Sequence, residues 1–356
     1  MNKKNYNLSK WITGKGPKSD IVISSRIRLA RNIEKIPFTH QSNSKQLEEV
    51  IKKVNNTLAK NNNKFSKDNE FNLEYIDMNK LSKIEKNILV EKHLISPPYA
   101  KSEHKRGLII NEDQDISIMV NEEDHLRIQI LKPGLQLNEC WKRADTVDDF
   151  FENEIDFAFS KKWGYLSSCP TNMGTGLRSS IMVHLPALNI TNNIEKMLGA
   201  VSQLGLAVRG LYGEGSESAG NVYQISNQIT LGQTEKDIIN NLESVTMQIL
   251  EQENRARKRL LEENEDFILD KIKRAYGTLK YAHMISNKEA LELLSYLKLG
   301  IDLEIIDNIE ADLLSKLMIL IRPSHLKNFF DEEINSDYQA VKRALLIQNY
   351  INKKEE

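Results

Sequence analysis

Five arginines are the first candidates for chemistry in this sequence. Arg26 and Arg28 lie two residues apart, so in an extended strand their side chains share one face. The other three, which stand near glycines or a carboxylate-rich turn, are Arg127, Arg178 and Arg209. A guanidinium binds phosphate oxygens through paired hydrogen bonds and keeps its charge at neutral pH. Brought together, the five would hold a triphosphate; dispersed, they would be solvated surface charges, and spacing alone does not decide.

A run of three carboxylates, Glu122, Glu123 and Asp124, is the second candidate. Adjacent carboxylates repel one another unless a cation lies among them, and a guanidinium substrate is such a cation. A positioned carboxylate would orient that substrate and accept its proton during attack, a contribution of roughly 10²–10⁴-fold. The alternatives are an acidic surface turn and a calcium site, although the spacing is not that of an EF-hand loop.

A segment rich in turn-forming residues, 167–178, is the third candidate. It matches neither a P-loop nor a dinucleotide fingerprint. Its cysteine, Cys169, stands among small polar residues with an arginine nearby, an environment in which a thiol can ionise. A buried structural cysteine is the alternative. The glycines at 174 and 176 suggest a backbone that comes close to a ligand.

Short apolar or alternating runs predict the strands that would position these residues. The expected strands span residues 20–30, 107–110, 116–120, 126–131, 179–185 and 222–225. A turn-like stretch at 111–115 joins two of them as a hairpin. An amphipathic pattern over 42–63 predicts a helix. The expected core is an antiparallel sheet with helices packed against it.

The second half of the chain has the pattern of helices. A helical pattern begins at Thr234, a capping box precedes Leu291, and residues 337–352 fit one last helix. No strand is expected after Arg255. The sequence therefore predicts two domains, 1–254 and 255–356.

Composition excludes several classes of protein. The 356 residues carry a formal net charge of -1, so no global basic field indicates nucleic acid. Two cysteines, Cys140 and Cys169, make neither a disulfide framework nor a structural zinc site. The first residues contain no apolar h-region, so we expect no secretory signal, and no apolar stretch approaches about 18 residues. We expect a soluble cytoplasmic protein without nucleic-acid or membrane partners.

Four segments in order closely resemble the catalytic domain of phosphagen kinases, such as creatine and arginine kinases. They are residues 22–28, 121–127, 169–178 and 209–214, and the resemblance covers about residues 20–250. It implies an α+β fold: a glutamine-synthetase-like antiparallel sheet flanked by helices, here followed by an all-helical C-terminal domain. It also implies ATP with Mg²⁺ bridging its phosphates, with no protein residue assigned as a metal ligand.

The same resemblance implies a role for each matching residue. Glu123 resembles the carboxylate that holds and deprotonates the guanidinium, assisted by Glu122; Glu214 resembles a second substrate carboxylate and Cys169 the active-site thiol. The implied nucleotide-binding set is Ser24, Ser25, Arg26, Ile27, Arg28, His93, Arg127, Arg178, Ser179, Ser180, Ile181, Met182, Arg209, Gly210, Leu211, Tyr212, Gly213 and Glu214.

The order of domains differs from that of phosphagen kinases. Those enzymes carry a helical domain before the first arginine motif, which here begins at Val22, whereas this chain has a helical region after the kinase part. That arrangement resembles the McsB family of bacterial protein-arginine kinases. A site without the small-molecule lid can admit an arginine displayed on a protein. A free-arginine phosphagen kinase and a non-catalytic adaptor on the same scaffold are the alternatives.

Partners also follow from this resemblance. It implies a CtsR-like heat-shock repressor and unfolded proteins as substrates, an McsA-like activator, and the Clp protease machinery as reader of the product. A homodimer is compatible with the sequence, which does not determine the oligomeric state. In that family the helical domain binds phosphoarginine through an Arg-Asp-x-x-Arg-Ala motif. Here residues 339–344 keep only Arg343 and Ala344. Each lost charge-assisted hydrogen bond removes roughly 1.5–3 kcal/mol, so an ordinary helix surface is an equally good interpretation.

Overall fold

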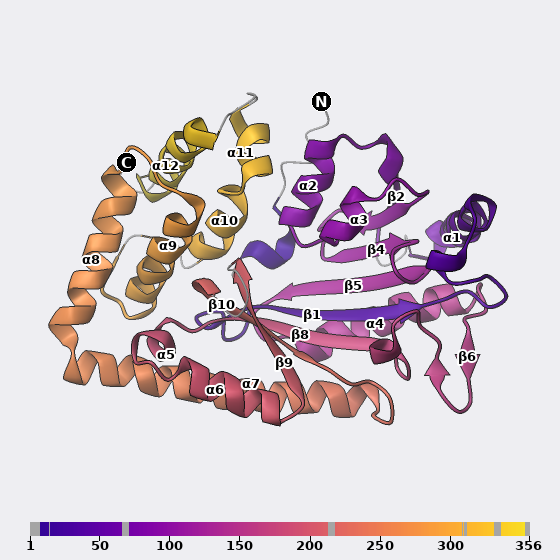
Figure 1. Cartoon of the computed structure of the whole chain (residues 1–356), viewed down its shortest axis with the longest axis horizontal. Helices are drawn as coiled ribbons and strands as arrows, with labels where there is room; N and C mark the ends of the chain where they lie inside the picture. The colour runs from indigo at the N-terminus through magenta and orange to yellow at the C-terminus, as the bar shows by residue number, and fades with distance from the viewer. Residues whose placement is uncertain are drawn as a thin grey trace.

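An eight-stranded antiparallel sheet forms the centre of the molecule (Figure 1). The computed structural model describes residues 8–13, 15–65, 71–212, 218–307, 309, 312–330 and 336–352. In spatial order the strands are β2 (Leu73–Asp77), β3 (Gly107–Asn111), β4 (Ile116–Val120), β5 (Leu126–Pro133), β1 (Val22–Arg31), β8 (Leu177–His184), β10 (Ser218–Asn227) and β9 (Leu206–Tyr212). Neighbouring strands are antiparallel throughout. The expected α+β architecture is confirmed.

Two strands of the sheet have no clear signal in the sequence. In β9 the central Arg209-Gly210 pair interrupts the run of apolar residues. Strand β2 has only five residues, Leu73–Asp77, and two of them are acidic. Both are edge strands, so each is paired on one side only. An edge strand needs less apolar surface than a central one, which explains why periodicity did not predict them.

Each face of the sheet is covered by a different group of helices. One face carries Ile27, Leu29 and Ile128, which belong to a core shared with α1 (Ser44–Phe65), α4 (Leu137–Glu152) and α7 (Glu235–Glu263). Met119, Leu131 and Met182 belong to a second core. Its other elements include η2 (Lys10–Thr13), α2 (Lys83–Glu91), α3 (Pro97–Lys101) and the C-terminal helices. The side chains of the sheet therefore alternate between two cores.

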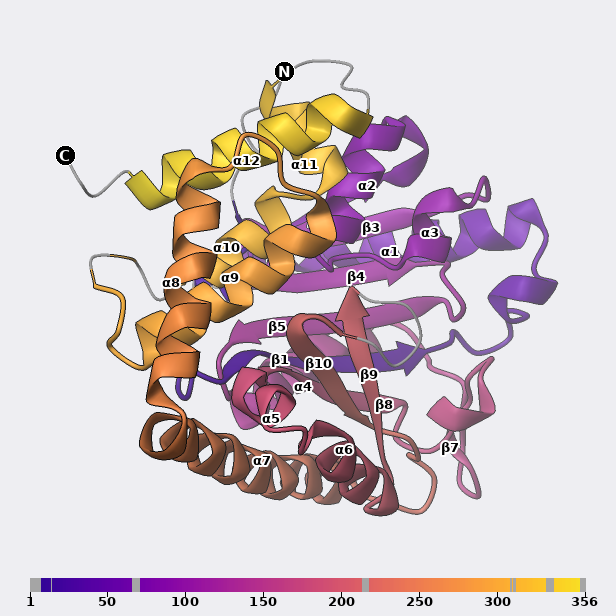
Figure 2. The same cartoon turned by 60° about the vertical axis from the view of Figure 1, so that its left-hand side comes forward.

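The C-terminal part is helical, as expected (Figure 2). Its helices are α8 (Glu265–Tyr281), α9 (Asn287–Asp302), α10 (Leu313–Leu320), α11 (Pro323–Phe330) and α12 (Ser336–Asn352). The residues described after Arg255 contain no strand. Helix α7 continues through the proposed division at 254/255, and the chain changes direction at Asn264. Within the described ranges, no helix combines the length and apolarity that crossing a bilayer requires.

Helix α9 packs directly on strand β10. Gly220 in β10 has φ +71°, and a Cβ there would lie 2.7 Å from the carbonyl oxygen of Leu291. Ser295 of α9 lies 2.7 Å from His184 Nε2 and accepts a hydrogen bond of 2.8 Å from Asn221. These buried contacts join the helical region to the sheet.

A second junction links α2 to α11. Glu91, the last residue of α2, accepts hydrogen bonds from the backbone N–H groups of Ser324 (2.9 Å) and His325 (3.0 Å). Its carboxylate also lies 2.6 Å from His325 Nδ1. A carboxylate at a helix N-terminus satisfies donors that have no partner within the helix. Glu91, at the end of α2, therefore caps the N-terminus of α11.

Replacing Glu91 by alanine should destabilise the protein by roughly 2–4 kcal/mol, because it leaves buried donors of α11 without an acceptor. Urea unfolding followed by circular dichroism measures the change. Glu292→Ala, on the exposed side of α9, is the matched control and should change stability by less than about 0.5 kcal/mol. Equal midpoints for the two variants would contradict the capping role.

Candidate functional site

The five arginines lie on the same face of the sheet. Residues paired across adjacent strands project to the same side, and so do residues two apart within one strand. Arg28 in β1 pairs with Arg178 in β8, and Ala30 pairs with Arg127 in β5. Arg26 donates a 2.7 Å hydrogen bond to Gln224 in β10, whose partner in β9 is Arg209. The structure therefore brings together all five residues singled out in the sequence.

Burial, together with repulsion among the arginines, disfavours the charged forms of Arg28 and Arg178. Burial lowers the pKa of Arg28 well below its ordinary value, and Arg26, Arg127 and Arg178 lower it further. Burial also lowers the pKa of Arg178, as do Arg209 and Arg127. The buried Nε atoms of Arg28 and Arg178 have no hydrogen-bond partner in the described part of the chain. A polyanion such as a triphosphate supplies both the missing acceptors and the opposite charge.

Two of the three carboxylates in the acidic turn are committed to structural bonds. Glu122 lies 3.0 Å from Arg127 Nη1 and accepts a 2.7 Å hydrogen bond from Ser96 Oγ. Burial raises the pKa of Glu122, but Arg127, Ser96 and the backbone N–H of Glu123 outweigh it, so this pKa lies below its ordinary value. Asp124 accepts hydrogen bonds from Asn32 (2.6 Å), Ser167 Oγ (2.9 Å) and the N–H of Ser168 (2.7 Å).

Glu123 is the carboxylate of this turn that remains available. Its side chain is exposed and makes no hydrogen bond or ion pair with any residue that the structure describes. Partial burial raises the pKa of Glu123, and the charges of Asp124 and Glu122 raise it further. A carboxylate whose pKa is raised binds a cation, or accepts a proton, more readily than an ordinary glutamate does.

A cavity of about 100 Å³ is lined by Glu123 and by three of the five arginines, Arg28, Arg127 and Arg178. Cys169 lies on its wall, with Sγ 3.0 Å from Thr171 Oγ1. The lining comes from β1, the acidic turn, the start of β5, the segment after Ser168 and the start of β8: Arg28, Leu29, Ala30, Glu122, Glu123, Asp124, Arg127, Cys169, Thr171, Asn172, Gly176 and Arg178. A guanidinium held by Glu123 would face a phosphate held by the arginines.

The glycines near this cavity serve packing. Gly176 has φ +68°, and a Cβ there would lie 2.5 Å from Arg31 Nη1 and 2.7 Å from the Ala30 carbonyl oxygen. Arg31 is itself buried in a salt bridge with Asp148 at 2.6 Å. The sequence suggested a close approach to a ligand at this glycine, whereas the close neighbour is β1.

His93 lies beside the arginine face in the turn that follows α2. Burial lowers the pKa of His93 to about 3, with further lowering from Arg26 and Arg322. Its ring meets that of Trp11 edge to face at 5.7 Å, and its carbonyl accepts a 2.8 Å hydrogen bond from Gln129. The imidazole is therefore neutral at physiological pH and cannot serve there as a cation.

Other expected nucleotide residues divide between the two faces of the sheet. Ser24, Ser180, Met182 and Leu211 share the arginine face by register, whereas the residues that alternate with them point into the opposite core. The latter are Ser25, Ile27, Ser179, Ile181 and Gly210. Ser25 Oγ, for example, donates to the carbonyl of Gly134 at 2.8 Å. The side chain of Tyr212, together with Gly213 and Glu214, lies outside the described residues.

Several residues of the site escaped the sequence interpretation. Gln129 and Gln224 share the arginine face, and Ser226 accepts a 3.3 Å hydrogen bond from Arg178. The two-residue spacing from Arg127 could have identified Gln129. No local pattern could have identified Arg322, which precedes α11 and acts on His93 from the helical region.

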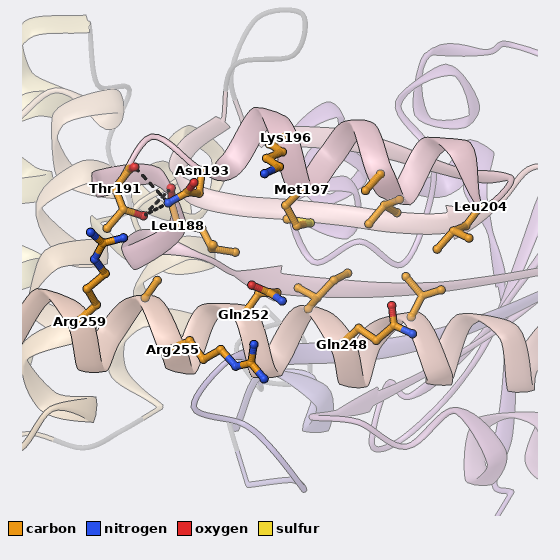
Figure 3. A pocket seen from close by; sticks show the side chains of 15 residues that line it. Leu188, Thr191, Asn193, Lys196, Met197, Leu204, Gln248, Gln252, Arg255 and Arg259 are labelled. Atoms are coloured by element: carbon orange, nitrogen blue, oxygen red, sulfur yellow. Dashed lines mark hydrogen bonds between the residues drawn. The ribbon is translucent and has the colours of Figure 1, made fainter.

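Neither a larger groove nor the degenerate C-terminal motif contributes to this site. The groove, of about 470 Å³, lies between α6 (Ile194–Gln203) and α7, with Lys196, Arg255 and Arg259 along it (Figure 3). None of the five arginines of the sheet lines it. In the helical region Arg343 is buried and donates to the carbonyls of Ile321 (3.1 Å) and Ile285 (2.9 Å). That guanidinium is thus engaged in holding the helices together.

Comparison with protein families accounts for most of the chain. Residues 49–256 match the model of the ATP:guanido phosphotransferase C-terminal catalytic domain. Residues 265–356 match the model of the protein-arginine kinase McsB C-terminal domain. The two matches adjoin near the end of α7.

Curated relatives match almost the whole length. The protein-arginine kinase of Halothermothrix orenii is 54% identical over 348 residues, covering 98% of both chains. The protein-arginine kinase of Desulforamulus reducens is 49% identical, and the match covers 97% of this chain and 96% of the relative. That of Bacillus pumilus is 46% identical, and the match covers 96% of this chain and 93% of the relative.

Solved structures with a similar fold are phosphagen kinases. Lombricine kinase superposes with a TM-score of 0.57 at 24% identity, covering 68% of each chain. The duplicated taurocyamine kinase of Schistosoma mansoni, with bound transition state analog components, gives 0.57 at 21% identity over 86% of this chain and 49% of its own. At this identity the likeness shows the fold.

Proposed function

This chain belongs to the protein-arginine kinases of the ATP:guanido phosphotransferase family, and we propose that it transfers the γ-phosphoryl group of ATP to arginine side chains in proteins. The observation that carries the proposal is a cavity lined on one side by the exposed carboxylate of Glu123 and on the other by Arg28, Arg127 and Arg178. One side suits a guanidinium and the other a triphosphate.

The proposed reaction joins a guanidinium nitrogen to the γ-phosphorus and breaks the bond from that phosphorus to the β,γ-bridging oxygen, so that ADP leaves. Glu123 orients the guanidinium and takes the proton that the nitrogen loses. The arginines neutralise charge on the transferring group and on ADP. Mg²⁺ would accompany the nucleotide and neutralise part of the charge on its phosphates. Glu122 acts indirectly, by holding Arg127 in place.

Labelled ATP separates this proposal from a free-arginine kinase. We expect the enzyme to place acid-labile label on arginines of an unfolded protein with far higher kcat/KM than on free arginine. Mass spectrometry that preserves the P–N bond identifies the modified residue. Label mainly on free arginine would assign the chain to the small-molecule kinases, and absence of label from both would favour a non-catalytic adaptor.

Bound nucleotide should protect Cys169 from alkylation, because its thiol lies on the wall of the cavity that the γ-phosphate enters. Iodoacetamide labelling followed by peptide mapping, with and without ATP and Mg²⁺, measures the rate. Cys140 is fully buried in the core and is the internal control, since it should remain unlabelled in both conditions. Equal labelling of Cys169 with and without nucleotide would place the thiol outside the site.

The proposed function extends to partners and place. As the sequence resemblance implies, a CtsR-like repressor and unfolded proteins are the proposed substrates, with an McsA-like activator, Clp protease as reader of the product, and action in the cytoplasm. Support comes from the match of the C-terminal helices to the family domain. Co-purification of the chain with each candidate partner, in the presence of ATP, tests these assignments.

A further inference from the structure

Exposed apolar side chains gather next to the wall of the catalytic cavity. Ile229 and Leu231, which follow β10, are 58% and 43% exposed. Phe159 and Trp163, on the small hairpin of β6 (Phe159–Ser160) and β7 (Gly164–Tyr165), are 58% and 41% exposed. Large apolar residues gathered on a surface usually mark a binding site.

The backbone holds Ile229 and Leu231 outward. Between them Thr230 is buried, and its hydroxyl lies 3.1 Å from the carbonyl oxygen of Thr171 and also contacts that of Met173. The threonine is turned inward by these contacts, whereas the aliphatic side chains on either side of it are exposed. Threonine is usually exposed and large aliphatic residues are usually buried, so this arrangement is the reverse of the common one. The arrangement keeps apolar surface in water, which is unfavourable unless something covers it.

The hairpin joins the same wall from the other side. Gly164 and Tyr165 form bridges with Gly174, and the N–H of Tyr165 donates to the Gly174 carbonyl at 2.8 Å. On its other side Gly174 approaches Leu231 so closely that a Cβ on the glycine would lie 3.0 Å from Leu231 Cα. A single residue therefore separates the hairpin from Leu231, and the patch forms a rim beside Thr171 and Asn172 of the cavity.

We propose that this rim, formed by Phe159, Trp163, Ile229 and Leu231, binds apolar residues that flank the acceptor arginine in a protein substrate. The inference rests on the proposed function, which puts the acceptor guanidinium between Glu123 and the arginines. The rest of an acceptor polypeptide must then leave the cavity across its mouth. Consecutive residues of an extended chain advance about 3.3 Å each, so residues one to three positions from the acceptor reach the wall at 171–174 and the rim beside it.

The chemistry of the rim also selects a class of substrate. Folded proteins bury most of their large apolar side chains, so an arginine with accessible apolar neighbours is most often found in an unfolded segment. A rim of this kind would thus direct the kinase to unfolded proteins without any separate recognition domain.

Two peptides of equal length and charge test the inference, one with the single arginine between leucines and the other with it between serines. For the unchanged protein we expect kcat/KM at least about tenfold higher on the leucine peptide, the factor that partial burial of two aliphatic side chains gives. The double variant Ile229→Ser/Leu231→Ser should reduce the preference to within about twofold. Tyr281→Ser, at an exposed aromatic residue of α8, should preserve it.

Other outcomes would contradict either the role of the rim in substrate binding or the proposed function itself. Equal kcat/KM on both peptides, or a preference that survives the double variant, removes the rim from substrate binding. If light scattering shows that the double variant converts a dimer to a monomer with the preference intact, the rim is a contact between two copies instead. If neither peptide is phosphorylated, the proposed function fails. The rim is then tested separately by the fluorescence anisotropy of labelled peptides in the presence of an unreactive ATP analogue. We expect the unchanged protein to bind the leucine peptide more tightly, and the double variant to lose this difference in affinity.

Discussion

Glutamine at position 123 should lower kcat for protein-arginine phosphorylation by about 10²–10⁴, because the amide cannot accept the proton that the attacking nitrogen loses. Affinity for ATP should change little, since the carboxylate contacts none of the described arginines directly. Quench-flow measurement of phosphoarginine formation gives the rate, and a fluorescent ATP analogue gives the affinity. Glu112→Gln, on the exposed turn between β3 and β4, is the matched control and should retain full activity.

The pH dependence of the unchanged enzyme should report the same group. Partial burial, Asp124 and Glu122 all raise the pKa of Glu123, so it becomes protonated at a higher pH than an ordinary glutamate. The acidic limb of the kcat/KM profile should therefore lie above the ordinary glutamate range of about 4.3. A Glu123→Gln variant that keeps both its rate and that limb would remove this residue from the reaction.

Arg28→Met should abolish tight nucleotide binding while stabilising the ligand-free protein. Its charged form is disfavoured in the folded state, since burial, Arg26, Arg127 and Arg178 all lower its pKa. Replacing it by an apolar side chain of similar length removes that repulsion, and we expect a gain of about 1–2 kcal/mol in the free energy of unfolding. We expect kcat/KM for ATP to fall by at least about 10²-fold, because charge-assisted bonds to phosphate are lost.

Thermal unfolding with and without ATP and Mg²⁺ checks both halves of this expectation. Ligand at a hundred times its dissociation constant should stabilise the unchanged protein by about 2.7 kcal/mol, and the variant by almost nothing. Arg274→Met, on the exposed face of α8, serves as control and should behave like the unchanged protein. A ligand-free variant that is less stable, yet still responds to ATP, would show that Arg28 is a structural residue.

Local sequence determined the elements that carry the site. Alternating apolar residues define β1, β5 and β8, and the two-residue spacing of Arg26 and Arg28 fixes them on one face of β1. The capping boxes at Thr234 and Ser286 begin α7 and α9 where the sequence predicts them. These features depend on neighbours within one helical turn or one strand, so they can be read along the chain.

The tertiary structure alone decided which of these residues can act. Three consecutive acids look equivalent in the sequence, yet Ser96, Arg127 and Asn32 bind two of them and leave Glu123 available. Those partners come from 5 to 92 positions away in the chain. The outward placement of Ile229 and Leu231 likewise depends on carbonyl groups some 60 residues earlier. Hydrogen-bond satisfaction and burial are properties of the assembled fold, so no local pattern of residues records them.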